Sequence, residues 1–163
     1  MPFRVAMARV TGGGEKDRLP IMSALTARFD LPLGTNAPRS ARHAVTAVLT
    51  GWGYRDELWL EKAAVVVSEL VTNAVRHGGG CVDLRLECHD GDVIISVADG
   101  SSVVPRRREP DDTGGRGLAL IDAMTARWGV RDHEGGKQVW AELPSCLADP
   151  LTGSAGRTRE GDR

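Results

Sequence analysis

Hydrophobic residues between positions 59 and 78 recur at intervals of three and four, the spacing of one face of an α-helix. At about 100° per residue, four polar residues fall together on the opposite side of that helix: Lys62, Glu69, Asn73 and Arg76. Asp56 is a suitable N-cap residue, and the glycines at 78–80 end the pattern. The pattern therefore predicts one long helix over Trp59–Gly78 that carries a polar stripe.

Alternation of hydrophobic and polar residues predicts four strands. They cover residues 25–31, 81–88, 93–98 and 138–143. The sequence H-D-G-D at 89–92 predicts a tight turn, so the second and third strands form an antiparallel hairpin. The sequence H-E-G-G-K at 133–137 predicts a second hairpin, whose first strand follows G-V-R-D.

Two shorter segments return to helical spacing. The first spans residues 40–51, with Ser40 as its cap. The second spans residues 117–128, and its hydrophobic stripe contains Leu118, Ile121, Met124 and Trp128, with Asp122 off that stripe. Residues 32–38 are predicted to be a loop. Residues 100–116 form a long irregular segment, which in a compact domain is usually functional or disordered.

The order of elements is strand, helix, helix, hairpin, loop, helix, hairpin. It predicts an α+β fold, a two-layer α/β sandwich with a mixed, mostly antiparallel sheet and helices on one face. We expect residues 25–144 to form this domain. Residues 1–24 show no sustained period and are expected to be a flexible leader, and residues 145–163 are expected to be a disordered tail.

Charge and composition exclude several classes of function. The net charge of −1 gives no broad field that favours nucleic acid or anionic lipid. The four histidines have no metal-ligand spacing, and no segment has the apolar length of a membrane span. There are three cysteines and no C-x-x-C motif, and Cys81 and Cys88 lie too far apart on one strand for a disulfide. We therefore expect a cytoplasmic protein that binds neither membrane nor nucleic acid directly.

The polar stripe of the long helix contains the first candidate chemistry. Glu69 and Asn73 lie one turn apart, and a carboxylate beside a carboxamide oxygen suits a magnesium ion, which prefers oxygen ligands and keeps several waters. The simpler interpretation is an exposed stripe in which such polar pairs are common. Residues further along the chain decide between the two.

Asp99 is the second candidate, because it shares the parity of Val93, Ile95 and Val97 and so leaves the strand on its buried face. A buried carboxylate requires a partner. Either Asp99 caps the turn with Gly100, or it accepts a hydrogen bond from the amino group of a flat ligand such as adenine.

The third candidate is the segment Thr113–Leu118, which opens a helix and contains three glycines. Glycines let a phosphate approach the backbone, and a helix N-terminus offers free N–H groups. A flexible glycine linker is the alternative. If all three simpler interpretations had to hold together, in this order along the chain, the coincidence would be large.

At this point the chain resembles a known superfamily. The sequences E-L-V-T-N-A-V-R-H-G, V-A-D-G and G-R-G-L-A-L-I resemble the N, G1 and G2 boxes of the GHKL ATP-binding superfamily, which contains histidine kinases and DNA gyrase B. The compact length and the ending W-G-V…G-K-Q-V-W-A-E-L are most similar to the stand-alone anti-sigma-factor serine kinases. The resemblance covers roughly residues 25–144.

The resemblance implies a Bergerat fold that binds ATP and Mg²⁺. Asn73 would bind the metal, Asp99 with Gly100 would hold the adenine, and Glu69 would be the general base. Arg76 shares the polar stripe and would meet phosphate. Phosphates would also be bound by the start of the third helix: Gly115, Arg116, Gly117 and Leu118.

The same resemblance implies the partners. The chain would phosphorylate a serine of a small anti-anti-sigma (STAS-type) protein and would act on transcription through a sigma factor, with a homodimer left open. The G1 box departs from Asp-X-Gly-X-Gly, because Ser101 and Val103 stand where glycines are expected. A non-catalytic, nucleotide-responsive interaction module is therefore the alternative function. An α+β domain whose motifs match by coincidence is a third interpretation.

Overall fold

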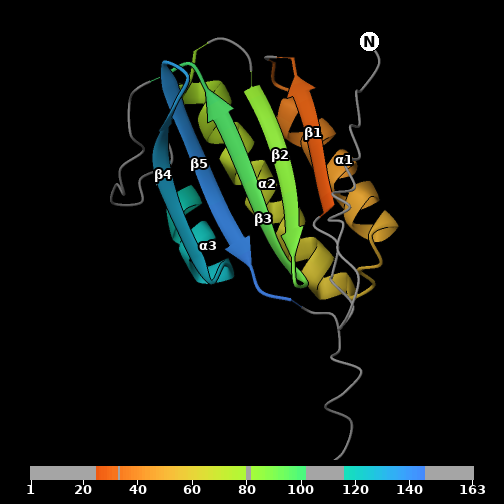
Figure 1. The fold of residues 1–163 in the computed structure, drawn as a ribbon. Coiled ribbons are helices and arrows are strands. Elements are labelled where there is room, and N and C mark those ends of the chain that lie inside the picture. The colour runs from red at the N-terminus through yellow and green to blue at the C-terminus, as the bar shows by residue number, and fades with distance from the viewer. Residues whose placement is uncertain (1–24, 33, 80–81, 102–115, 146–163) are drawn as a thin grey trace, which may run out of the picture.

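The computed structural model describes residues 25–32, 34–79, 82–101 and 116–145. Within them lie eight elements in chain order: β1 (Leu25–Leu31), α1 (Ala37–Gly51), α2 (Glu57–His77), β2 (Val82–His89), β3 (Asp92–Asp99), α3 (Arg116–Met124), β4 (Arg127–His133) and β5 (Gly136–Leu143). The strands form one sheet in the order β1-β2-β3-β5-β4, and the helices cover one of its faces (Figure 1). The predicted α+β two-layer fold is confirmed.

Every pair of neighbouring strands in the described sheet is antiparallel. A mixed, mostly antiparallel sheet was expected, and the described residues contain no parallel pair. The pairs β2–β3 and β4–β5 are hairpins, which are antiparallel by construction. The remaining two pairs, β1 with β2 and β3 with β5, are antiparallel as well.

Helix α2 is the long helix that the hydrophobic spacing predicts. Asp56 caps it as expected, because its Oδ1 accepts a hydrogen bond from the backbone N–H of Trp59 at 2.9 Å. Its apolar face is buried, at Trp59, Ala63, Val66, Val67, Leu70, Val71 and Ala74. The inner face of the sheet supplies the other half of the core, including Leu84, Leu86 and Ile95. Each such aliphatic side chain contributes about 1.5–3 kcal/mol of transfer free energy when fully buried.

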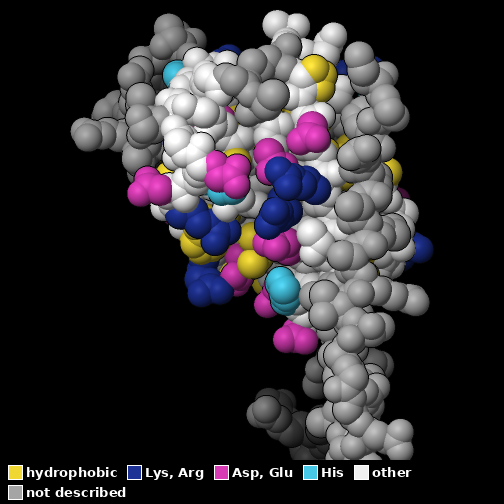
Figure 2. Space-filling model, turned by 45° about the horizontal axis from the view of Figure 1, so that its top comes forward, with side chains coloured by type: hydrophobic (Ala, Val, Ile, Leu, Met, Phe, Trp, Pro, Cys, Tyr) yellow, Lys and Arg dark blue, Asp and Glu magenta, His cyan; other side chains and the backbone are white. Residues whose placement is uncertain are grey.

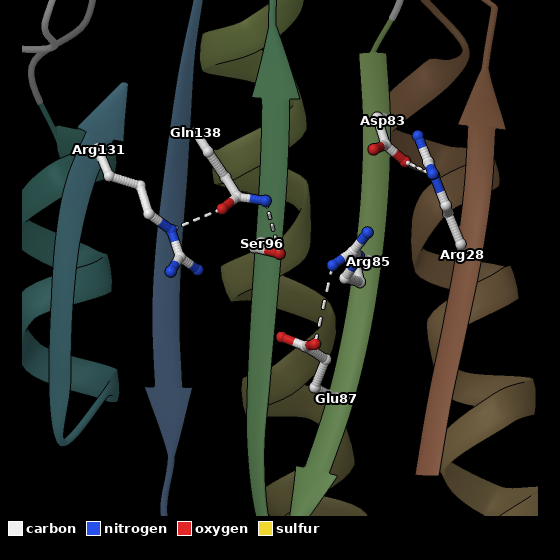
Figure 3. Close-up of polar contacts among 7 residues, drawn as sticks. All are labelled: Arg28, Asp83, Arg85, Glu87, Ser96, Arg131 and Gln138. Carbon is white, nitrogen blue, oxygen red and sulfur yellow. Dashed lines mark hydrogen bonds and ion pairs between the residues drawn. The ribbon is translucent and has the colours of Figure 1, made fainter. Parts of the chain in front are cut away.

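The outer face of the sheet has no helix over it and is polar. Its polar contacts join Arg28 of β1 with Asp83 of β2, Arg85 with Glu87 along β2, and Gln138 of β5 with both Arg131 of β4 and Ser96 of β3 (Figure 3). The hydrogen bond that Arg28 donates to Asp83 and the charge of that carboxylate raise the pKa of Arg28, so this arginine stays charged. Basic and acidic side chains are intermixed on the face in Figure 2, and no patch of one sign forms there.

Both predicted hairpin turns are confirmed. Asp90 and Gly91 have φ angles of 52° and 90°, and Glu134 and Gly135 have φ angles of 40° and 83°. Positive φ at both central residues is characteristic of the two-residue type I′ turn, which matches the twist of the flanking strands.

The predicted start of α1 at Ser40 is wrong. The helix begins at Ala37, and Asn36 is its N-cap residue without a side-chain cap bond. Pro38 lies in the first turn, where the missing N–H of proline has no intrahelical partner to lose. Residues 37 and 38, assigned to a loop from the sequence, are therefore helical.

The predicted extension of the last helix to Trp128 is also wrong. Helix α3 ends at Met124, and Trp128 lies in β4 opposite Ala141. Trp128 still packs against the core and donates from Nε1 to Asp122 Oδ1 at 3.0 Å. Because it follows Met124 by four residues and reaches the same core, helical spacing alone did not distinguish strand from helix.

None of the described helices is long and apolar enough to cross a membrane. Cys81, the leader at 1–24, the tail at 146–163 and most of the irregular segment at 100–116 lie outside the described residues. Cys88 is a buried free thiol.

The strands β3 and β5 approach closely at the end of β3. A Cβ atom added to Gly136 would overlap the backbone oxygen of Asp99 and would lie 2.8 Å from Gly100 Cα. Real Cβ atoms do not come this close to backbone, so a side chain at this position forces β3 and β5 apart.

We expect Gly136→Ala to lower the free energy of unfolding by about 1–3 kcal/mol, the usual cost of overpacking. Gly34→Ala is the matched control, because a Cβ there meets nothing within 4 Å. Urea denaturation followed by tryptophan fluorescence measures both. Equal midpoints for the two variants would contradict the close approach.

Candidate functional site

Helices α2 and α3 bring the predicted polar stripe and the predicted glycine segment together. Gly117 lies in the first turn of α3, and a Cβ atom added to it would lie 2.6 Å from Glu69 Oε2 and 3.9 Å from Asn73 Nδ2. The start of α3 therefore faces Glu69 and Asn73 directly. Glycine at 117 leaves the space that the Glu69 carboxylate occupies.

Asn73 has an unsatisfied hydrogen-bonding group at this point. Its Nδ2 atom is buried and has no hydrogen-bond partner among the described residues. A buried polar group without a partner costs free energy, and in native proteins such a group usually binds water, an ion or a ligand. An acceptor-rich ligand such as a phosphate satisfies an amide N–H, and the amide oxygen of the same side chain suits a magnesium ion.

Asp99 lies at the end of β3 with its side chain only 2% exposed, as its parity predicts. Its Oδ1 accepts hydrogen bonds from the backbone N–H of Ser101 and from Lys137 Nζ, both at 2.9 Å. The first bond closes a turn at Gly100, the simpler role considered for Asp99. The second bond is a buried ion pair that the sequence analysis missed.

The end of α2 connects these two groups. A Cβ atom added to Gly78, the C-cap residue of α2, would lie 2.7 Å from Asp99 Cγ. Asn73 precedes Gly78 by five residues, which is about 7 Å along a helix axis. Glu69, Asn73 and Gly117 therefore lie together on α2 and α3, and Asp99 lies at the C-terminal end of α2.

The other predicted site residues are placed as follows. Gly100 is exposed and donates from its backbone N–H to Gly79 O at 2.7 Å. Arg76 is exposed near the end of α2. The side chain of Leu118 belongs to the core, so only its backbone faces a ligand. Arg116 is the first residue of α3, and Gly115 lies outside the described residues.

Lys137 is the site residue that the sequence analysis did not identify. It has the parity of Val139, Ala141 and Leu143, which face the core, and it is 3% exposed. A lysine on the buried face of a strand requires an anionic partner. The parity of the strand was therefore a readable signal for this residue.

No group of three or more His, Cys, Asp or Glu side chains in the described part of the chain could hold a metal ion. These residues therefore do not form a site for a tightly held metal such as structural zinc. Magnesium differs, because it is commonly bound through one or two protein oxygens together with waters and substrate phosphates. The site fits magnesium carried with a nucleotide.

Comparisons with known proteins bear on the family and the fold of this chain. The model of the histidine kinase-like ATPase domain family matches residues 32–143. A comparison with curated protein sequences found no match. One similar solved structure is that of the RsbU and RsbW domains of Rv1364c from Mycobacterium tuberculosis, at 22% identity and a TM-score of 0.59. It is matched over 74% of this chain, which spans 32% of that chain's length.

A second similar structure is the SiaB–SiaC complex from Pseudomonas aeruginosa. The identity is 14% and the TM-score 0.51, with 71% of this chain and 89% of that chain covered. At these identities the two structures support the fold. The family match, which covers most of the chain and includes α2, β3 and α3, carries the assignment. The chain belongs to the histidine kinase-like ATPase domain family.

Proposed function

We propose that this protein is an ATP-dependent serine kinase of the anti-sigma-factor type. It transfers phosphate to a serine of a small anti-anti-sigma, STAS-type protein and regulates transcription through a sigma factor. The observation that carries the proposal is the contact of Gly117 with Glu69 and Asn73, which places a carboxylate and an unsatisfied amide at the N-terminus of α3.

In this proposal the phosphates of ATP lie between the end of α2 and the start of α3. Backbone N–H groups at Gly115, Arg116, Gly117 and Leu118 donate to them, because the first N–H groups of a helix have no intrahelical acceptor. The exposed Arg76 adds positive charge on the same stripe. Asn73 would hold Mg²⁺ through its amide oxygen. When bound, the metal neutralises charge on the phosphates.

Glu69 is the general base. It is half-buried on α2, and no described residue forms an ion pair with it, so its carboxylate is available to accept a proton. The partner's serine O–H gives its proton to Glu69 while the serine oxygen forms a bond to the γ-phosphorus. The bond between that phosphorus and the bridging oxygen of ADP breaks, and ADP leaves.

Asp99 and Gly100 form the adenine side of the site. Both donors found for Asp99 reach Oδ1, and Oδ2 is the atom proposed to accept from the adenine amino group. The partner assignment rests on the sequence resemblance and on the similar structures, one of which is a complex of two proteins. A cytoplasmic location fits an enzyme that uses ATP, and self-association into a homodimer is compatible with the proposal.

A specific observation also favours the second candidate, a nucleotide-responsive interaction module without turnover. The Asp99 carboxylate already has a lysine partner, and Ser101 stands in place of a glycine. Calorimetry with ATP and ADP, set beside a transfer assay, separates the two candidates. Tight binding without transfer to any partner would favour the module.

Phosphate transfer depends on Glu69 in the kinase proposal. With labelled ATP, Mg²⁺ and the cognate partner, we expect Glu69→Gln to lower the transfer rate by at least about 100-fold, because general-base catalysis contributes roughly 10²–10⁴-fold. Binding of ATP should change less than about threefold. Lys62→Ala, on the same stripe but remote from α3, is the control. Undiminished transfer by Glu69→Gln would contradict the assigned role.

Metal-dependent binding depends on Asn73. We expect Asn73→Ala to weaken ATP binding about tenfold or more with Mg²⁺ present, and to weaken it less when Mg²⁺ is removed by chelation, because only the hydrogen bond from Nδ2 to phosphate is then lost. Isothermal titration calorimetry under both conditions measures this. An equal loss under the two conditions would show that the amide contacts the phosphates without a metal.

Gly117 tests the contact between the two helices. Gly117→Ala improves helix propensity, yet its Cβ would meet Glu69 Oε2 at 2.6 Å and displace the carboxylate. We expect ATP affinity to fall about tenfold. Gly51→Ala is the matched control, since a Cβ at this helical glycine meets nothing within 4 Å. Unchanged affinity and transfer in Gly117→Ala would contradict the proposed position of Glu69.

A further inference from the structure

We propose that Lys137 reads the purine base together with Asp99. In this proposal the lysine donates a hydrogen bond to the ring nitrogen N1 of adenine while Asp99 accepts one from the adjacent amino group. The inference rests on the proposed ATP site and adds a specificity-determining residue to it. Its basis is the buried position of Lys137, together with the donor of Lys137 and the acceptor of Asp99 that have no partner among the described residues.

The register of the sheet places Lys137 directly opposite Asp99, on the neighbouring strand β5. The side chain of Lys137 is 4% exposed and that of Asp99 is 2% exposed. The ammonium lies 2.9 Å from Asp99 Oδ1 and 3.5 Å from the backbone oxygen of Ser101. Both charges are thus removed from water at the end of the sheet where β3 stops.

A structural role is a weak explanation for such a pair. The desolvation free energy of two buried charges often exceeds the free energy of their mutual attraction. Apolar residues of similar volume often stabilise a protein as much or more. The rest of the inner face of β5 follows that rule, with Val139, Ala141 and Leu143. Lys137 is the exception, and it lies beside the carboxylate proposed to bind the base.

The hydrogen bonds of the pair leave one donor and one acceptor side by side. An ammonium has three N–H donors, and two of them reach Asp99 and Ser101. The carboxylate uses Oδ1 for both of its described donors, which leaves Oδ2 for a ligand. Adenine presents a matching edge, because its amino group donates and the neighbouring N1 accepts. A base in the hypoxanthine family presents the reverse order, with an exocyclic oxygen that accepts and an N1–H that donates.

The order of the pair selects adenine. Asp99 receives the exocyclic amino group and Lys137 meets the ring nitrogen, so a carbonyl in place of the amino group would face a carboxylate. A site designed to hydrogen-bond a particular edge discriminates strongly against an analogue that lacks it, because its buried polar groups are then left unpaired.

The experiment compares three nucleotides with three forms of the full chain. ATP, 1-deaza-ATP, in which N1 is replaced by C–H, and inosine triphosphate are each titrated by calorimetry. The proteins are the wild type, Lys137→Met and the surface control Lys62→Met. We expect the wild type to bind 1-deaza-ATP about tenfold more weakly than ATP, and inosine triphosphate more weakly still. Lys137→Met should bind ATP and 1-deaza-ATP equally, and Lys62→Met should match the wild type.

Each other outcome has a defined meaning. Equal binding of ATP and 1-deaza-ATP by the wild type overturns the role of Lys137 and leaves the proposed ATP site standing. Discrimination that persists in Lys137→Met assigns N1 to another residue and also overturns it. Tighter binding of inosine triphosphate than of ATP overturns the order of the pair. If the wild type binds none of the three, the proposed function fails, independently of Lys137.

Lys137→Met leaves Asp99 buried without a cation, which can prevent folding. A second variant keeps the proposal testable in that case. Lys137→Gln keeps an N–H donor, one bond shorter in reach, and removes the charge. We expect it to retain part of the discrimination between ATP and 1-deaza-ATP. Complete loss of discrimination in a folded Lys137→Gln variant, with ATP affinity unchanged, would show that the charge alone acts, and would overturn the proposed hydrogen bond to N1.

Discussion

Close approach at glycines is the constraint on which the site depends. At Gly117, Gly78 and Gly136 an added Cβ would fall within 3 Å of Glu69 or Asp99. These contacts join the start of α3, the end of α2 and the strands β3 and β5 around two acidic side chains. Since protein interiors are close-packed, a side chain at Gly78 or Gly136 would meet backbone and force an element to move, whereas one at Gly117 would displace the Glu69 carboxylate. Glycines at 117, 78 and 136 therefore leave the space in which Glu69 and Asp99 lie.

The two acidic groups experience different surroundings. Asp99 is almost fully buried and has a lysine and a backbone N–H as partners. Glu69 is half-buried beside an amide that has no partner among the described residues. A paired carboxylate is held in one orientation, which suits recognition of a rigid ring. A carboxylate without a cation beside it is suited to accept a proton.

Much of this arrangement was predictable from sequence, because its causes are periodic. The helical spacing before Gly78 gave α2 and its polar stripe, and period-two alternation placed Asp99 on the buried face. The hairpins followed from D-G and E-G-G, which tolerate positive φ. The fold was obtained from these signals and from the resemblance of the three motifs to a known superfamily.

The errors arose where the chain is not periodic or where two periods coincide. Trp128 reaches the core from a strand at a spacing that also fits a helix. The start of α1 depends on a proline tolerated only in the first turn. Lys137 was missed because a hydrophobic pattern was extended backwards only to Val139, whereas the same parity continues to a charged residue. Its partner lies 38 positions away in the chain, and only the register of the sheet reveals the contact.

That register has a consequence for how the site can be altered. Lys137 follows directly after the two-residue turn at Glu134–Gly135 and the strand-initiating Gly136. If one residue were removed from this hairpin and β5 moved by one position against β3, every side chain of the strand would exchange faces. The neutral amide of Gln138 would then stand beside Asp99, and the lysine would move to the solvent side of the sheet. In the proposed site, the register of β5 thereby determines which chemical group would face the base.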